Sequence, residues 1–343
     1  MDRLLRLGAG RRTNLALLLL LAAALGTGAL AFGIGGDWVR WAAVAHGVAG
    51  LAIVVLAPWK SAISARGVRR RRPGMSLSLA LALVVAVTVA TGIVHATGLL
   101  VSLGPVSAMQ VHVAAAIASI PLALWHVGTR KTLPRRTDVS RRNLLRGGVL
   151  IGSAAAGYAV VEGLVRATGL PGSKRRATGS FESGSLAPDE MPITQWLNDS
   201  VPRVDPGAWS LQIADATGER RLDYVELSSH RTAIRAVIDC TGGWYAEQDW
   251  EGVLLSDLLT SGSADAASIL VRSVTGYGRR FPIEDAGRLL LATRVAGREL
   301  SAGHGFPLRL VAPGRRGFWW VKWVDRVSLS ETPWWWQPPF PLA

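Results

Sequence analysis

Long apolar runs dominate the first half of the chain. Each run is about 20 residues long and carries almost no charge, and a helix of about that length crosses the hydrocarbon core of a bilayer. Buried helices of a water-soluble core rarely run this long without a charged residue. The sequence therefore predicts an all-α bundle of five transmembrane helices. The five runs span about residues 14–34, 38–58, 75–99, 106–128 and 147–167.

A different pattern begins after the last apolar run. Residues 171–190 are rich in Gly, Ser and Pro and lack periodicity, which is typical of a linker. From residue 191 onward, short apolar segments such as 209–213 and 269–271 alternate with turns at Gly and Pro, and this spacing predicts strands. The chain is therefore expected to be multidomain, with a transmembrane domain over 1–170 and a mixed α/β domain over 191–343.

The distribution of charge predicts the orientation of the helical bundle across the membrane. The chain has a net charge of +14, which by itself would fit a nucleic-acid-binding protein. Residues 1–12, 60–72 and 129–146 carry net charges of +3, +6 and +6, so the remainder of the chain nets −1. These three segments lie on one side of the predicted bundle, which argues against nucleic-acid binding and fits a protein embedded in membrane lipid. By the positive-inside rule, the N-terminus is cytoplasmic and the domain after residue 167 lies outside the cell membrane.

A short basic string precedes the fifth apolar run. Ser140-Arg141-Arg142-Asn143-Leu144-Leu145-Arg146, followed by a Gly/Ala-rich run to residue 157, resembles a twin-arginine export signal, the bacterial address for proteins translocated already folded. An ordinary basic flank of a helix is the alternative interpretation. Because domains exported in this way usually carry a cofactor inserted in the cytoplasm, the string favours a cofactor in the outer domain of an inner-membrane protein.

Four of the six histidines lie within the predicted spans, where ionisable side chains are costly and mark functional sites. His46 and His112 lie about eight and six residues into spans that both begin outside, so their depths agree within about one helical turn. Helical bundles bind haem through histidines on facing helices. We therefore predict one haem b ligated by His46 and His112, with His95 as the alternative ligand and His126 as a hydrogen-bonded or interfacial group.

The second domain contains the only cysteine of the chain, Cys240, in the stretch AVIDCTGGWYAEQDWEG. A single cysteine cannot form an internal disulfide, and a free cysteine is often simply a small buried hydrophobe. A thiolate is also a soft ligand suited to a sulfur-coordinated transition metal. The sequence has no HExxH, CxxC or GxSxG motif and no common phosphate-binding glycine loop, which argues against the zinc, nucleotide and serine-hydrolase chemistries that those motifs serve.

Two blocks of the second domain resemble the sulfite-oxidase-type molybdopterin oxidoreductases. One block surrounds Cys240 and continues through Trp250-Glu251-Gly252-Val253; the other runs from His304-Gly305-Phe306-Pro307 to Val321-Lys322-Trp323. They stand in the family's order, and the resemblance covers about residues 190–330. It implies a mixed α/β molybdopterin-binding fold with molybdenum ligated by Cys240. The residues that it implies at the molybdopterin are His304, Gly305, Arg309, Gly314, Gly317, Lys322 and Trp323.

Departures from the sulfite-oxidase pattern favour another branch of this family. Thr241-Gly242-Gly243-Trp244, directly after Cys240, contains no arginine, and Trp334-Trp335-Trp336 stand where the sulfite oxidases have a tyrosine after the Lys-Trp motif. The spacing of Cys240, Trp244, Trp250 and Gly252 is similar to that of the periplasmic methionine-sulfoxide reductase branch, which works with a haem-containing membrane partner. The three consecutive tryptophans either line the substrate mouth or lie at the lipid interface, where tryptophan is enriched.

The residues and the resemblance together predict a membrane-anchored, molybdopterin-dependent enzyme. It is expected to transfer an oxygen atom to or from a small S- or N-oxide substrate, with electrons passing through the haem to or from quinone or a membrane redox partner. A sulfite dehydrogenase is the alternative substrate assignment. A non-enzymatic membrane cytochrome with a degenerate outer binding domain is the alternative from another functional class.

Overall fold

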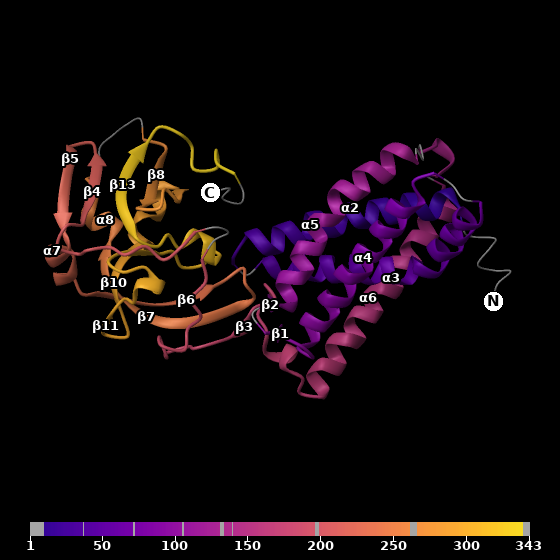
Figure 1. Ribbon diagram of the computed structural model, residues 1–343, viewed down its shortest axis with the longest axis horizontal. Helices are drawn as coiled ribbons and strands as arrows, with labels where there is room; N and C mark the ends of the chain where they lie inside the picture. Colours follow the sequence, from indigo (N-terminus) through magenta and orange to yellow (C-terminus); the bar gives the residue numbers. More distant parts are fainter. Residues whose placement is uncertain are drawn as a thin grey trace. The chain divides into compact units, whose positions relative to one another are not determined.

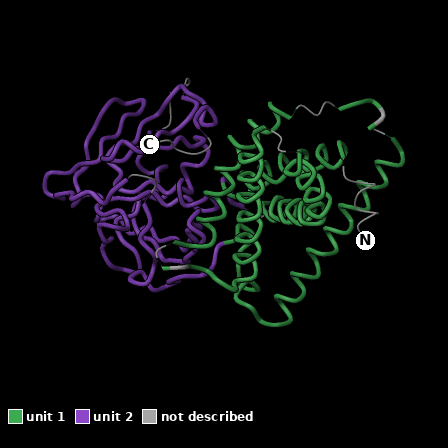
Figure 2. Tube along the Cα trace, turned by 45° about the vertical axis from the view of Figure 1, so that its right-hand side comes forward, with its two compact units in different colours: residues 1–32, 37–179 green, residues 33–36, 180–343 purple. Residues whose placement is uncertain are grey.

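A computed structural model describes residues 10–36, 38–70, 73–104, 106–130, 134–138, 140–195, 199–260 and 266–338. The chain divides into two compact units, residues 1–32 with 37–179 and residues 33–36 with 180–343 (Figure 2). Several of the charges counted above lie outside the described residues: Asp2, Arg3, Arg6, Arg71, Arg72 and Lys131.

The first unit consists of long helices (Figure 1). Among the described residues, five helices are long and apolar enough to cross a membrane, which confirms the five predicted spans. Many of their large apolar side chains, such as Leu19, Leu83 and Leu124, are exposed, as expected of surfaces that lipid covers. The helices are α2 (Arg11–Gly33), α3 (Val39–Arg69), α4 (Met75–Thr97), α5 (Ala108–Thr129) and α6 (Arg141–Ala167).

Two of these helices are longer than the apolar runs that predicted them. Helix α3 continues past Pro58 to Arg69, and α6 begins at Arg141, where the Ser140 side chain caps the helix by accepting a hydrogen bond from the Asn143 N–H at 3.4 Å. Hydropathy marks only the part of a helix that lipid can cover, so polar helical turns beyond that part are missed. The connection between α4 and α5 forms a small hairpin of β1 (Ser102–Leu103) and β2 (Val106–Ser107).

The second unit is built on two mainly antiparallel sheets, which confirms the predicted mixed domain, although its helices are short. In its described part, one sheet runs β11-β10-β7-β3, with β12 beside β10 and β6 beside β7; the other runs β5-β4-β13-β8-β9. The first sheet comprises β3 (Phe181–Glu182), β6 (Thr232–Asp239), β7 (Trp244–Leu254), β10 (Leu290–Val295), β11 (Arg298–Glu299) and β12 (Arg309–Val311). The second comprises β4 (Ser210–Asp215), β5 (Gly218–Asp223), β8 (Ser268–Ser273), β9 (Gly278–Phe281) and β13 (Val324–Ser330).

Short helical segments connect these strands. They are the helices α7 (Tyr224–Ser229) and α8 (Leu255–Leu258) and the 3₁₀ turns η3 (Ile283–Arg288), η4 (Ala302–His304) and η5 (Gly317–Trp319). The first unit also contains the 3₁₀ turns η1 (Arg136–Asp138) and η2 (Pro171–Lys174).

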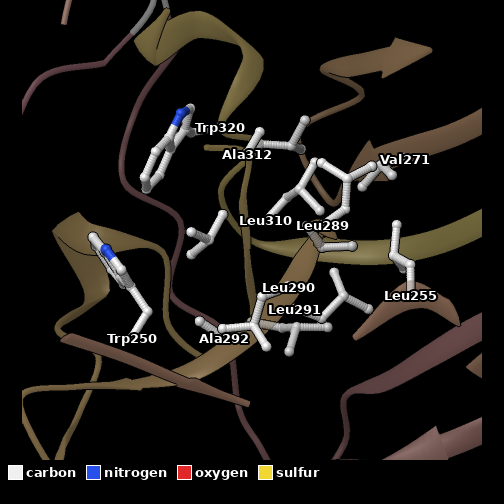
Figure 3. Packing of buried hydrophobic residues seen from close by; sticks show 14 of the residues in the cluster. Trp250, Leu255, Val271, Leu289, Leu290, Leu291, Ala292, Leu310, Ala312 and Trp320 are labelled. Atoms are coloured by element: carbon white, nitrogen blue, oxygen red, sulfur yellow. The ribbon is translucent and has the colours of Figure 1, made fainter. Parts of the chain in front are cut away.

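The core of the second unit is apolar and includes Trp250, Val271, Leu291 and Leu310 (Figure 3). Strand β7 alternates between buried and half-buried positions, so that Ala246, Gln248 and Trp250 point inward. Gly252 has a steric role in this strand, because a Cβ at that position would lie 2.0 Å from the Leu291 carbonyl oxygen of β10. Gly252 is part of the block that resembles the molybdopterin oxidoreductases, and the close approach of β7 and β10 explains why a glycine stands there.

The segment predicted as a linker is divided between the two units after Gly179. In the first unit, Arg175 forms an ion pair with Glu162. In the second unit, β3 pairs in parallel with the start of β7, and the Leu186 N–H donates to the Glu247 carbonyl at 2.8 Å. The Gly- and Ser-rich residues of this segment therefore make defined contacts within each unit.

Candidate active site

Cys240 lies directly after β6, at the tight turn into β7. Its side chain is buried, with 8% of its surface exposed. The Gly242 N–H points at the Cys240 sulfur at 3.3 Å, and Gly243 adopts φ +92°, a conformation that favours glycine. Burial raises the pKa of the Cys240 thiol, and the Gly242 N–H opposes that shift. The thiol is therefore held in a fixed direction and becomes a thiolate readily only when a metal or other cation binds it.

A cavity of about 90 Å³ is lined in part by Cys240. The structure brings both sequence blocks together here, because Cys240 and five residues of the second block line the same cavity. Those five are His304, Arg309, Gly317, Lys322 and Trp323.

The other two predicted cofactor residues are glycines that shape the backbone around the cavity. Gly305 ends η4 at φ +109°, and a Cβ there would lie 2.9 Å from the Arg309 Cβ. Gly314 turns the chain at φ +76°. Neither is among the described residues that line the cavity.

Arg309 is a buried cation in the cavity wall, with only 1% of its surface exposed. Its guanidinium stacks over the rings of Trp250 and Trp320, at 4.9 and 5.7 Å from their centroids. Its Nε has no hydrogen-bond partner among the described residues, and burial lowers the pKa of Arg309 to about 9. Since an uncompensated buried charge costs several kcal/mol, this position is suited to an anionic ligand.

Lys322 supplies a second cation to the same cavity. Its Nζ donates to the carbonyl oxygens of Thr194 at 2.9 Å and Gly303 at 2.6 Å. Burial, and then the charge of Arg309, lower the pKa of Lys322 to about 7. An anion bound between the two cations would raise that pKa again, so ligand binding and lysine protonation favour each other.

His304 has both ring nitrogens engaged within the protein. Nε2 donates to the Met191 carbonyl at 3.1 Å, and Nδ1 lies 2.9 Å from the Ser301 hydroxyl, which also accepts the His304 N–H. Burial, and then the Arg309 charge, lower the pKa of His304 to about 4, so the ring is neutral. It fixes the Met191 segment in the cavity wall, and its role as a donor to the cofactor stays a prediction.

Comparison with known proteins agrees with this geometry. Residues 198–336 match the oxidoreductase molybdopterin binding domain. The chain is similar to sulfite oxidases, with 27% identity to that of Homo sapiens over 166 residues and 28% to that of Gallus gallus over 194 residues. It is also 27% identical over 236 residues to the protein-methionine-sulfoxide reductase catalytic subunit of Gluconobacter oxydans. The second unit therefore contains an oxidoreductase molybdopterin binding domain, and the chain is similar to the sulfite-oxidase-type molybdopterin oxidoreductases.

The extent of these matches differs between the relatives. The human match covers 38% of this chain and 30% of the sulfite oxidase, and the Gallus gallus match covers 44% and 41%. The reductase match covers 58% of this chain and 72% of that subunit. The chain therefore spans about a third of the length of the human sulfite oxidase that it matches.

Sequence reasoning missed several cavity residues, Tyr277 above all. The sulfite-oxidase pattern has a tyrosine after the Lys-Trp motif, where this chain has tryptophans, and the tyrosine that lines this cavity lies in the turn between β8 and β9. The Tyr277 hydroxyl donates to the Phe318 carbonyl, and burial raises its pKa. Thr194 and Asp199 also line the cavity. Their local sequences carry no signal that would have identified them, since only strand pairing brings them to Cys240.

The three consecutive tryptophans near the C-terminus are not among the described residues lining the cavity beside Cys240. Trp334 packs against the core beneath Arg315, whereas Trp335 and Trp336 are 62% and 69% exposed. Indoles from elsewhere, on Trp244, Trp320 and Trp323, form part of the cavity wall instead. The cavity lining therefore does not support the substrate-mouth alternative, and the lipid-interface alternative stays a prediction.

The first unit brings two of the predicted haem ligands together. The rings of His46 and His112 have centroids 5.7 Å apart and are perpendicular. The Nδ1 of His46 donates to the Ala24 carbonyl at 2.9 Å, and that of His112 donates to the Thr88 carbonyl at 2.7 Å. This leaves both Nε2 atoms as the candidate ligands. Two rings that ligate one metal ion through metal–nitrogen bonds of about 2 Å have centroids about 6 Å apart, which is close to the separation of this pair, and the haem itself stays a prediction.

Two glycines allow the histidine rings to approach the neighbouring helices. A Cβ on Gly28 would lie 2.9 Å from the His46 ring, and one on Gly92 would lie 3.0 Å from the His112 ring. Each glycine stands four residues after the carbonyl that accepts the Nδ1 hydrogen bond. The pairs α2–α3 and α4–α5 therefore repeat one arrangement, in which a glycine and a carbonyl of one helix orient the histidine of the next.

The other two membrane histidines have different partners. The Nε2 of His95 donates to the Gly179 carbonyl at 2.7 Å. The Nδ1 of His126 lies 3.1 Å from the Ser78 hydroxyl. The geometry favours His46 and His112 over His95 as a ligand pair, and it fits the prediction that His126 is a hydrogen-bonded group.

Proposed function

We propose that this protein is a membrane-anchored, molybdopterin-dependent oxidoreductase that transfers an oxygen atom to or from small S- or N-oxides. The observation that carries the proposal is that Cys240, as a soft ligand, and Arg309, as a buried cation lacking a partner at Nε, line one cavity. When bound, the molybdenum centre supplies two-electron oxygen-atom transfer. Reduction of a sulfoxide consumes two electrons and two protons and releases one water; oxidation of the product is the reverse.

Different residues around the cavity would bind different parts of the cofactor. Cys240 would ligate the metal, and its direction is set by the Gly242 N–H. Arg309 and Lys322 would neutralise the anionic end of the pterin by charge-assisted hydrogen bonds. Gly317 lets the backbone approach closely, because a Cβ there would lie 3.0 Å from the Cys240 Cα.

The remaining wall of the cavity favours an uncharged substrate. Indole rings of Trp244 and Trp323 offer apolar contact, and the Asp199 carboxylate adds a negative charge. A carboxylate in the wall disfavours an anion such as sulfite, which is the kind of repulsion that creates specificity. The methionine-sulfoxide reductase named above supports the same substrate class, and sulfite oxidation is the alternative that a substrate screen tests.

We infer that a haem b between His46 and His112 carries the electrons one at a time to or from quinone or a membrane redox partner. The bis-histidine geometry and the glycine at each ring support this inference. In the same proposal, the five helices span the inner membrane and the second unit lies outside it. The clustering of basic residues in alternate connections supports that orientation.

Metal analysis tests the central proposal, with Arg309→Met as the diagnostic variant. Purified wild-type protein should contain about one molybdenum per chain and reduce methionine sulfoxide or related S- and N-oxides. Arg309→Met should lose most of the molybdopterin. Cofactor-free Arg309→Met should nevertheless be more stable by about 2 kcal/mol, because an uncompensated buried charge is removed. For a unit of this size that corresponds to a rise of about 4–8 °C in Tm.

The matched control is Arg298→Met, since Arg298 is an exposed arginine paired with Asp189. It should change neither molybdenum content nor Tm appreciably. Wild-type protein that lacks molybdenum after production with sufficient molybdate would contradict the proposal and favour the non-enzymatic cytochrome. If sulfite alone is turned over, the protein is still an enzyme, but the proposed S- and N-oxide substrates are wrong.

Export of the second unit should depend on the twin-arginine string. Arg141 and Arg142 lie exposed in the first turn of α6, where an export receptor can reach them. Arg141→Lys with Arg142→Lys should therefore strand residues 180–343 in the cytoplasm, protected from protease added to spheroplasts. The charge-matched control, Arg135→Lys with Arg136→Lys, should leave the second unit accessible. Digestion of this unit in both double variants would mean that another route translocates it.

A further inference from the structure

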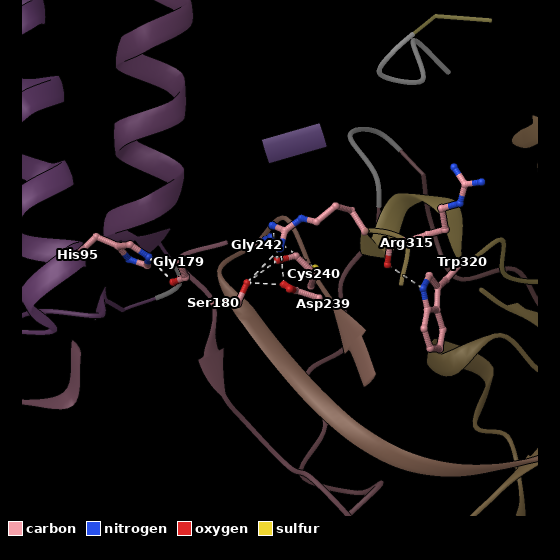
Figure 4. Close-up of polar contacts among 9 residues, drawn as sticks. His95, Gly179, Ser180, Asp239, Cys240, Gly242, Arg315 and Trp320 are labelled. Atoms are coloured by element: carbon pink, nitrogen blue, oxygen red, sulfur yellow. Dashed lines mark hydrogen bonds and ion pairs between the residues drawn. The ribbon is translucent and has the colours of Figure 1, made fainter. Parts of the chain in front are cut away.

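A buried polar cluster lies on the backbone side of Cys240, within the second unit (Figure 4). The Arg316 guanidinium pairs with the Asp239 carboxylate and donates to the Cys240 carbonyl at 3.2 Å. The Ser180 hydroxyl lies 2.6 Å from the same carboxylate and 3.3 Å from the same carbonyl. The exposed fractions of Ser180, Asp239 and Arg316 are 0%, 7% and 1%. The cluster therefore holds the backbone of the proposed metal ligand from inside the protein.

The burial of this ion pair sets it apart from others in the chain. Among ion pairs between described residues, Arg316–Asp239 is the one in which both side chains are less than 10% exposed. Arg235–Asp249, at the other end of the same strand pair, has side chains that are 56% and 43% exposed. A buried pair contributes little net stability, because desolvation of both charges offsets their attraction. Stability alone therefore does not account for its presence at this position.

The cluster also joins the two sequence blocks. Asp239 and Arg316 form an isolated parallel β-bridge, and Gly317 lies against the Cys240 backbone. The segment that carries Arg316 lies between Arg309 and Lys322, the two cations of the cavity. A displacement of this segment would therefore move the anion-binding groups and the cysteine relative to each other.

We propose that Arg316, Asp239 and Ser180 form a positioning cluster that fixes the Cys240 thiolate at the distance and direction that molybdenum requires. This inference rests on the proposed function, in which Cys240 ligates the metal. The planar guanidinium suits the role because it bonds the carboxylate and the carbonyl at once. A lysine retains the charge but donates from one nitrogen only, so it cannot reproduce the planar geometry in which two guanidinium nitrogens contact the carboxylate and the carbonyl.

The test compares Arg316→Met/Asp239→Leu, Arg316→Lys and Ser180→Ala with Arg315→Met in the full-length protein. The double variant removes both charges together, so no unpaired buried charge threatens the fold. Arg315 is the matched control. It directly precedes Arg316 in the same loop, and it also pairs with a buried carboxylate, that of Asp285. Ser180→Ala removes only one hydroxyl. It tests the cluster even if the double variant does not fold.

In the loaded enzyme, the double variant should lose kcat by about 10- to 100-fold with KM changed less than about twofold, because a misplacement of about 1 Å costs about that much rate. The electron paramagnetic resonance signal of its molybdenum should shift, as should that of Arg316→Lys. Ser180→Ala should show the same changes to a smaller extent. Arg315→Met should match the wild type in kcat and in the signal. Wild-type signals in both Arg316→Lys and the double variant would overturn the proposal.

The cofactor-free protein provides a second readout that does not depend on molybdenum. Cys240 is the only thiol of the chain, so alkylation by iodoacetamide reports on it alone. The double variant and Ser180→Ala should be alkylated at least about fivefold faster than the wild type, because the turn at Cys240 opens locally more often. Equal alkylation rates would contradict the cluster's role even if the wild type contains no molybdenum, whereas absence of molybdenum alone would contradict only the proposed function.

Discussion

Replacing Cys240 with serine should reduce turnover of the protein to background. The substitution changes one atom in a buried turn, so the fold should persist. A serine oxygen is a hard ligand that remains protonated near neutral pH, and it cannot replace a soft thiolate at a sulfur-coordinated metal. We therefore expect loss of catalysis without loss of the second unit.

The measurement pairs steady-state reduction of methionine sulfoxide with the haem absorption spectrum of the same sample. The membrane spectrum should be unchanged, because the proposed haem ligands belong to the other unit. It serves as the internal control for insertion and folding. Near-normal turnover in Cys240→Ser would refute the assignment of Cys240 as the metal ligand.

Alanine at His46 or at His112 should remove the haem, lowering haem per polypeptide by at least about tenfold. Each ring would provide one bond to the haem iron, and a b-type haem is held mainly by such bonds and by packing. His126→Ala should retain the haem, because that ring contacts Ser78 in the structure. Full retention of haem in His46→Ala, or two haems per chain, would contradict a single site between His46 and His112. Loss only in His95→Ala would move the ligand assignment to the alternative histidine.

The glycine at each ring allows a second test of the same site. Gly28→Ala and Gly92→Ala should weaken haem binding, since the added Cβ would lie about 3 Å from the ring that each glycine accommodates. Gly26→Ala, on the same helix as Gly28, is the matched control, because no described atom lies within 4 Å of a Cβ there. Equal haem content in Gly26→Ala and Gly28→Ala would show that the close packing at His46 has no part in haem binding.

The sequence by itself determined the five helices of the first unit and the class of the second. A bilayer requires about 20 apolar residues per span whatever the neighbouring helices are, so the length of each run is sufficient evidence. The strands of the second unit were visible for a related reason, since short apolar segments such as 209–213 and 269–271 are bounded by turns at Gly and Pro. The lone cysteine and the second block also indicated the resemblance to the molybdopterin oxidoreductases before any contact was known.

Only the tertiary structure decided which side chains surround Cys240. Tyr277 and Asp199 reach the cavity from separate connections, and Arg316 reaches Asp239 from a loop 77 residues away. It also changed the interpretation of His304, whose nitrogens bind Ser301 and the Met191 carbonyl. Hydropathy and local motifs report whether a residue is buried and what chemistry it carries. They do not report its partners, because strand register and helix packing fix those contacts across long stretches of chain.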